Sequence, residues 1–129
     1  MVDVVACILL KDRKFLVERR RSDDPADAGF VCIPGGHVDK DESLEEALKR
    51  EMREELNIIV KKAEMIFKDI YIASNGERQT CYYFHITGWS GNPSSDEATE
   101  IFWETDLNKL TVDIDRRAVK VVLKKSSRI

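Results

Sequence analysis

The chain has 129 residues, a length that fits one domain, and we expect residues 1–129 to form that single domain. Its composition, 43% hydrophobic and 35% charged residues, excludes a disordered, collagen-like or membrane-spanning chain. The 21 basic and 24 acidic residues leave a net charge of -3, so the overall charge gives no reason to expect nucleic acid or an anionic membrane as a partner.

The cysteines and the N-terminal segment bear on the cellular compartment of the protein. Cys7, Cys32 and Cys81 lie in apolar, strand-like segments and form no C-x-x-C pair, so we expect reduced thiols in the core. The opening segment MVDVVACILLKDRK has no basic leader before its apolar stretch and no cleavage site of small residues. We therefore expect a cytoplasmic domain.

The N-terminal part of the chain favours strands. Apolar runs at residues 2–10, 15–17 and 30–33 are separated by a turn at 11–13 and a polar loop at 20–28. The first run is apolar on both of its alternating faces, as in a strand that is covered from both sides. Pro34-Gly35-Gly36 is expected to end the third strand and to supply a turn whose backbone can approach a ligand closely.

The C-terminal part predicts a hairpin, a strand and a helix. Strand-like runs at 58–73 and 80–87 flank Asn75-Gly76, a pair favoured where both central residues of a tight turn need positive φ. A Ser/Gly/Pro loop at 90–95 leads to a short strand at 101–103, and a helix begins at about Asp115. Acidic residues at its start and lysines at its end suit the helix dipole.

Residues 44–56 predict a helix that breaks its own amphipathic pattern. Ser43 and Glu46 form a capping box at its start. At about 100° per residue, the apolar positions form one stripe, yet Glu51 and Glu55 lie inside that stripe and Glu54 lies at its edge. The other charged positions form a solvated face, and these are Glu45, Glu46, Lys49, Arg50 and Arg53.

Three carboxylates on a core-facing patch need compensation. Burying a carboxylate is costly unless it is paired or binds a metal. Positions i, i+3 and i+4 converge on one patch, which is the geometry for oxygen ligands around a divalent cation, and Mg²⁺ or Mn²⁺ is the natural occupant. The alternative is an ordinary Glu-rich surface helix. The glycine pair just upstream favours the metal site, because a main-chain carbonyl there can join the acids.

The segment from Gly36 through Glu42 to Arg50-Glu51-Met52-Arg53-Glu54-Glu55-Leu56-Asn57-Ile58 resembles the Nudix box, G-x5-E-x7-R-E-U-x-E-E-x-G-U. Every specified position matches except Asn57, where the family usually has Gly. Asn tolerates the left-handed conformation that ends a helix, so we expect the turn to survive. The resemblance implies an α/β fold of the Nudix type, an α/β/α sandwich around a mixed sheet.

The resemblance also implies roles for particular residues. Glu51, Glu54 and Glu55 would hold Mg²⁺, with Mn²⁺ as a substitute, and the Gly36 carbonyl would be a further ligand. Glu51 is our choice for the general base. Arg50 and Glu42 would form an ion pair that joins the loop to the helix and orients the ligands. A further metal acid is expected from the late loop, with Glu97 as first choice and Glu100 as its rival.

For substrate binding, Arg19, Arg20, Arg21 and His37 are candidates for contacts with phosphate, although an arginine run is as often solvated. Asp113 or Asp115 is a candidate for reading a base edge, and helix capping explains them equally well. Aromatic residues suited either to stacking on a base or to the core are Phe30, Tyr71, Tyr83 and Phe84.

The resemblance and the size favour a MutT-like nucleoside triphosphate pyrophosphohydrolase that releases NMP and pyrophosphate, including from oxidised deoxynucleoside triphosphates. The nearest enzymatic alternative is a dinucleoside polyphosphate or ADP-ribose hydrolase. An alternative of another class is a catalytically silent nucleotide-binding module, although such modules typically lose box acids that this chain retains. We expect a small-molecule substrate, no nucleic-acid or membrane partner, and a monomer or homodimer.

Overall fold

A computed structural model describes residues 1–96, 98 and 100–126. The strands are β1 (Val2–Lys11), β2 (Lys14–Arg19), β3 (Val31–Cys32), β4 (Gly35–His37), β5 (Ile59–Ile72), β6 (Arg78–Ser90) and β7 (Glu100–Glu104). The helices are α1 (Leu44–Leu56), the 3-10 helix η1 (Leu107–Lys109) and α2 (Asp113–Ser126). In the described part of the chain, no helix is long and apolar enough to span a bilayer.

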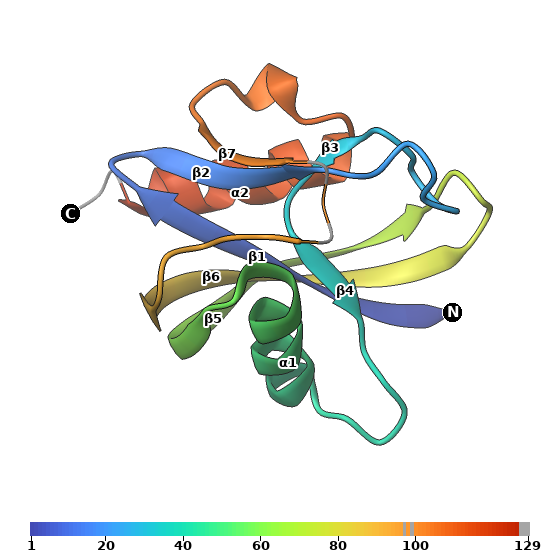
Figure 1. Cartoon of the computed structure of the whole chain (residues 1–129), viewed down its shortest axis with the longest axis horizontal. Helices are drawn as coiled ribbons and strands as arrows, with labels where there is room; N and C mark the ends of the chain where they lie inside the picture. Colours follow the sequence, from blue (N-terminus) through green and yellow to red (C-terminus); the bar gives the residue numbers. More distant parts are fainter. Residues whose placement is uncertain (97, 99, 127–129) are drawn as a thin grey trace.

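The described strands form one mixed sheet in the order β3-β2-β1-β6-β5, with β4 paired to β1 and β7 paired to β2. The β1–β6 pair is parallel, and the other pairs are antiparallel. Strand β1 therefore lies in the middle of the sheet, and both helices lie against it (Figure 1). This arrangement confirms the predicted sandwich around a mixed sheet.

The two faces of β1 serve two separate cores. Ala6 and Ile8 pack with the buried side chains of α2, whereas Cys7 and Leu9 pack with those of α1. The alternation of side chains along a strand places these two sets on opposite faces. The strand that is apolar on both sides is thus covered by a helix on each side. The three cysteines are buried free thiols, as predicted.

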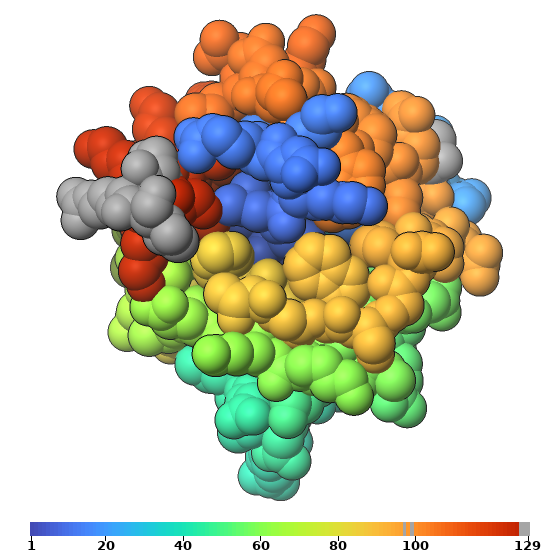
Figure 2. Space-filling model, turned by 90° about the vertical axis from the view of Figure 1, so that its left-hand side faces the viewer, coloured from blue at the N-terminus to red at the C-terminus, as the bar shows by residue number. Residues whose placement is uncertain are grey.

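Most predicted elements are present, with shifts of a few residues at their ends. Helix α1 spans the predicted residues, with both hydrogen bonds of the capping box present. Helix α2 begins at Asp113, earlier than predicted, and has Asp113 and Asp115 in its first turn and Lys124 and Lys125 in its last. The loop at 38–43 before α1 projects from the body of the molecule in both overall views (Figure 1 and Figure 2).

Two local predictions are wrong. Gly35 and Gly36 do not form a turn, because they belong to β4 and pair with Ala6 and Val5 of β1. The close approach expected of them is nevertheless present, since a Cβ on Gly35 would collide with the Val5 backbone. In the β5–β6 hairpin only Gly76 has positive φ, at 87°, so the connection is a longer loop closed by a glycine rather than a two-residue turn.

Asn57 ends α1 in the left-handed conformation, with φ 57° and ψ 33°. Its backbone N–H donates to the Arg53 carbonyl, and its side-chain amide donates to the carbonyl and the hydroxyl of Ser94 at 3.2 and 3.0 Å. The residue that departs from the motif therefore ends the helix and also ties the loop after β6 to it.

We expect Asn57→Ala to lower the free energy of unfolding by about 1–2 kcal/mol, because alanine is strained in this conformation and makes neither amide hydrogen bond. Asn57→Gly should stay closer to the wild type, since glycine relieves the backbone strain while losing the same bonds. Urea denaturation of the three proteins measures the order. An alanine variant as stable as the wild type would contradict this role for Asn57.

Candidate active site

A cavity of about 360 Å³ is lined by residues of β1, β4, β6, α1, the β2–β3 loop and the start of α2. Segments far apart in the sequence line it, and the residues used below are Arg20, Asp27, Ile33, Gly36, His37, Glu51, Glu54, Glu55, Tyr71, Tyr83 and Asp115. Helix α1 contributes the carboxylates of Glu51, Glu54 and Glu55 to the lining, whereas Asp27 comes from the β2–β3 loop and Asp115 from α2. We call the α1 acids the acidic wall and the two aspartates the second region, or Asp115 region, of the cavity.

The acidic wall is built by α1 and β4. Glu51 is only 8% exposed, and Glu54 and Glu55 follow it at the spacing that places all three beside one another on the helix. Gly36 of β4 lies directly against Glu51, because a Cβ on this glycine would collide with the Glu51 carboxyl group. A side chain at this position would therefore have to displace the Glu51 carboxyl group.

Arg50 joins the acids to the loop before α1. Its Nε and Nη2 donate to both oxygens of Glu42 at 2.7 and 2.9 Å, and Nη1 donates to Glu51 at 2.8 Å and to Glu54 at 3.2 Å. Nη2 also donates to the His37 carbonyl at 2.9 Å. The guanidinium holds the pKa of Glu42 down to about 2 by its side-chain hydrogen bonds.

The Arg50 contacts correct one prediction and agree with another. The helical wheel placed Arg50 on a solvated face, but its long side chain reaches round to Glu51 and Glu54. The ion pair with Glu42 that the motif implied is present. Among the described residues, no three side chains of His, Cys, Asp or Glu are grouped closely enough to hold a metal ion.

The donor set nonetheless fits a divalent cation. Glu51, Glu54 and Glu55 supply hard carboxylate oxygens from a single helix to the same cavity wall. The backbone of Gly36 comes close enough to Glu51 that a side chain there would fill the space. Arg50 balances charge on two of these acids, so the patch is compatible with a folded domain before a cation binds.

The second region of the cavity contains two buried aspartates. Asp115 accepts hydrogen bonds from the backbone N–H of Ile33 at 3.1 Å and from the Tyr83 hydroxyl at 2.5 Å. Burial raises the pKa of Asp115 to about 6, against the lowering effect of these two donors. Asp27 accepts from the Tyr71 hydroxyl at 2.9 Å, and burial together with this contact raises the pKa of Tyr71.

The predicted arginines have different surroundings. Arg20 lines the cavity, where its Nη2 donates to Asp24 at 3.0 Å and its Nε donates to the Ala26 carbonyl at 3.1 Å. Arg19 and Arg21 are not in the lining, and they are ion-paired with Glu100 and Asp23 at the surface. The structure thus brings one arginine of the three to the cavity.

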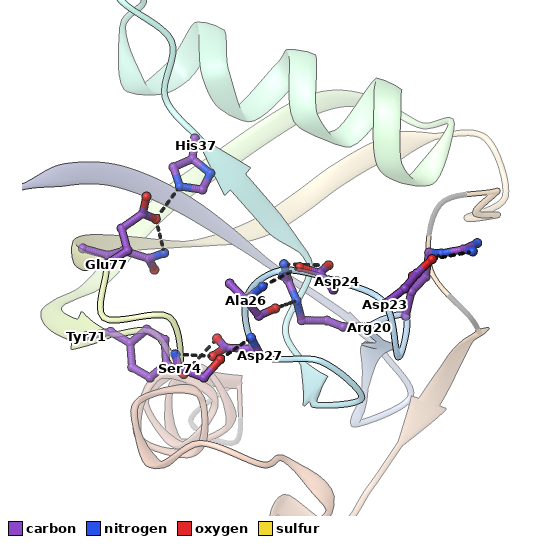
Figure 3. A network of polar contacts seen from close by, with 11 residues as sticks. Arg20, Asp23, Asp24, Ala26, Asp27, His37, Tyr71, Ser74 and Glu77 are labelled. Carbon is purple, nitrogen blue, oxygen red and sulfur yellow. Dashed lines mark hydrogen bonds and ion pairs between the residues drawn. The ribbon is translucent and has the colours of Figure 1, made fainter.

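The remaining candidates for binding metal or phosphate are His37, Glu97 and Glu100. His37 lines the cavity, and its Nε2 lies 2.6 Å from Glu77 Oε1 (Figure 3). Glu100 takes part in the ion pair with Arg19, outside the cavity lining. Glu97 lies outside the described residues.

Sequence reasoning missed Asp27 and left Asp115 undecided between two roles. Asp27 sits in an irregular loop, and its partners Tyr71 and Ser74 come from a hairpin far along the chain. No periodicity or motif marks such a residue. Asp115 accepts from Ile33 and Tyr83 through its two oxygens, so its carboxylate serves the cavity wall rather than only the helix end.

A mixed sheet between two helices, with an acidic helix beside a glycine strand, defines the α/β sandwich class that carries a Nudix box. The chain belongs to the NUDIX domain family, whose sequence profile matches residues 1–121. Members of this family generally use divalent metal ions.

Individual relatives agree with this assignment. The chain is 36% identical over 89 residues to the CTP pyrophosphohydrolase of Escherichia coli K12, covering 69% of this chain and 61% of that protein. It is 32% identical over 89 residues to the 8-oxo-dGTP diphosphatase of Haemophilus influenzae, covering 69% and 63%. The chain thus spans less than two thirds of the length of these two curated relatives.

A solved structure shows the same fold over nearly its full length. The MutT NUDIX hydrolase from Burkholderia pseudomallei superimposes with a TM-score of 0.81 at 27% identity, covering 94% of this chain and 97% of that one. The similarity therefore extends from the acidic helix to the strands and helix that form the second region of the cavity.

The raised pKa of Asp115 predicts a pH-dependent stability. Between about pH 4 and pH 6 the unfolded state loses the proton while the folded state keeps it, so stability falls as the pH rises through this window. The Asp115→Asn variant does not titrate at this position. Compared with this variant, the free energy of unfolding of the wild type should fall by up to about 3 kcal/mol across this pH window. Denaturant unfolding at several pH values measures the difference, and a difference that stays constant would contradict the assignment.

Proposed function

We propose that the chain is a metal-dependent hydrolase that cleaves nucleoside triphosphates into a nucleoside monophosphate and pyrophosphate. The observation that carries the proposal is the acidic wall of α1 beside Gly36, which shares one cavity with the Asp115 region. Similarity to the CTP pyrophosphohydrolase and to the 8-oxo-dGTP diphosphatase supports the substrate class, including oxidised deoxynucleoside triphosphates.

Glu51, Glu54 and Glu55 would hold Mg²⁺, with Mn²⁺ as a substitute, and the Gly36 carbonyl would complete this set. A bound divalent cation neutralises phosphate charge and lowers the pKa of a water. Carboxylate and carbonyl oxygens are the ligands that such hard cations prefer. Glu97 and Glu100 remain the two candidates for an additional acid from the late loop.

The other side chains of the cavity would bind and orient the substrate. Glu51 is our candidate for the base that takes the proton from water, since it is the most buried acid of the α1 wall. Arg50 would orient Glu51 and Glu54 through the hydrogen bonds it already makes. Arg20 and His37, which line the cavity, would contact phosphate.

The Asp115 region would recognise the base. A carboxylate accepts hydrogen bonds, so Asp115 favours a base edge that presents N–H donors. Its two oxygens are held by Ile33 and Tyr83, which fix its direction before a ligand arrives. Distinguishing nucleotides by a buried polar group of this kind is effective, because a mismatched base leaves the group without its partner.

Two other functions compete with this proposal. A dinucleoside polyphosphate or ADP-ribose hydrolase would use the same acidic wall with a different second moiety. A silent nucleotide-binding module would need the acids only for structure. The ion pairs of Arg50 with Glu42, Glu51 and Glu54 are all present in this chain, and this favours an active hydrolase. The net charge of -3 favours no nucleic-acid or membrane partner. We further propose a cytoplasmic enzyme, monomeric or homodimeric, and its three free cysteines support the reducing compartment.

The direct experiment is turnover of a nucleotide panel with Mg²⁺. We expect pyrophosphate from nucleoside triphosphates, with CTP and 8-oxo-dGTP as the first substrates to try. Cleavage of dinucleoside polyphosphates or ADP-ribose alone would favour the alternative hydrolases. Calorimetric binding of a nonhydrolysable nucleotide without turnover of any member of the panel would favour the silent module.

We expect Glu55→Gln to lower kcat at least about 10²-fold while the fold stays intact, because the amide supplies no negative charge to a cation. Glu45→Gln is the matched control, since Glu45 lies on the exposed side of the same helix and pairs with Lys49. Steady-state kinetics and circular dichroism check both variants. Unchanged activity of the Glu55 variant would remove this residue from the metal site.

A further inference from the structure

Asp27 connects two segments that flank the cavity. It lies in the loop between β2 and β3, is 8% exposed, and faces the β5–β6 hairpin. Its backbone N–H donates to the Ser74 hydroxyl at 2.6 Å, and its carboxylate accepts from the Ser74 backbone N–H at 2.8 Å and from the Tyr71 hydroxyl at 2.9 Å (Figure 3). We call these three hydrogen bonds the Asp27 latch.

The latch has to overcome two unfavourable features of Asp27. Its backbone has a φ of 54°, a left-handed conformation that L-residues seldom adopt. Its carboxylate is buried, which is costly unless donors surround it. The contacts with Ser74 are reciprocal, because the backbone N–H of each residue donates to the side chain of the other. Contacts of this kind hold both segments in one relative position.

The latch lies next to the residues that hold Arg20. Arg20 donates to the carbonyl of Ala26, the residue before Asp27, and to the carboxylate of Asp24. The other oxygen of Asp24 accepts from the Ala26 N–H at 3.0 Å. Figure 3 shows Arg20, Asp24 and Ala26 close to Asp27. Since these contacts hold Arg20 in the cavity lining, the position of its guanidinium depends on the loop that Asp27 fastens to the hairpin.

We propose that Asp27 is a positioning residue, which, fastened by Ser74 and Tyr71, holds the loop so that Arg20 faces the phosphates of the substrate. This inference rests on the proposed function, in which Arg20 contacts phosphate. Arg20 would bind the substrate equally in the ground state and in the transition state. Loosening the latch should therefore weaken binding and leave the chemical step unchanged.

Ser74→Ala removes the hydroxyl that accepts from the Asp27 backbone N–H and keeps the Ser74 backbone N–H. Tyr71→Phe removes the hydroxyl that donates to the Asp27 carboxylate. Each variant should raise KM for a nucleoside triphosphate about fivefold, with kcat changed less than about twofold. Ser90→Ala, at the exposed end of β6, is the matched control and should leave both constants unchanged. An unchanged KM in both latch variants, or an equal loss of kcat, would overturn the proposal.

A double-mutant cycle tests whether the latch acts through Arg20. In the background of Arg20→Gln, Ser74→Ala should raise KM by less than about twofold, because the guanidinium that it positions is absent. Effects on KM that multiply in the double variant would show that the latch acts independently of Arg20, and would overturn the positioning role.

Trypsin cleavage after Arg21 gives a readout that needs no activity. Arg21 is exposed in the same loop. We expect cleavage there about fivefold faster in Ser74→Ala than in Ser90→Ala, and equal rates would overturn the latch.

If the wild type hydrolyses no nucleotide, the proposed function is wrong, but the latch can still be tested. In that case the Kd of inorganic tripolyphosphate replaces KM, and an unchanged Kd in both latch variants overturns the positioning role.

Discussion

The structure of the candidate site depends on the guanidinium of Arg50. Negatively charged carboxylates that lie together on a core-facing wall repel one another and lose hydration. They therefore need a positively charged partner if the domain is to fold without a bound cation. Arg50 supplies it to Glu51 and Glu54 while Glu42 holds the guanidinium bidentately. The same contacts fasten the projecting loop to the helix, since Arg50 also donates to the His37 carbonyl.

The rest of the fold brings a second set of groups to the same cavity. Strand β1 carries β4 at one edge and packs on both helices, so the glycine backbone, the acids of α1 and Asp115 of α2 meet at one cavity. Gly36 lies so close to Glu51 that a Cβ on this glycine would require the Glu51 carboxylate to shift. The Asp27 latch joins the β2–β3 loop, which also lines the cavity, to the hairpin.

Local signals in the sequence predict much of this. The limits of α1, the strand with two apolar faces and the intrusion of Glu51 into an apolar stripe follow from capping, periodicity and residue type. The sequence does not indicate that Gly35 and Gly36 form a strand, because β4 is defined only by its pairing with β1. Arg50 was misplaced because a helical wheel ignores the reach of a long side chain. Asp27 was missed because the hairpin that holds it is distant in sequence.

The most direct test of the account is a crystal of the protein soaked in Mn²⁺ and measured for anomalous scattering. The account predicts an ion coordinated by carboxylate oxygens of Glu51, Glu54 and Glu55 and by the Gly36 carbonyl. It also predicts that Arg50 keeps its two hydrogen bonds to Glu42. An ion bound elsewhere, or no ion while Glu51 and Glu54 stay on Arg50, would contradict it.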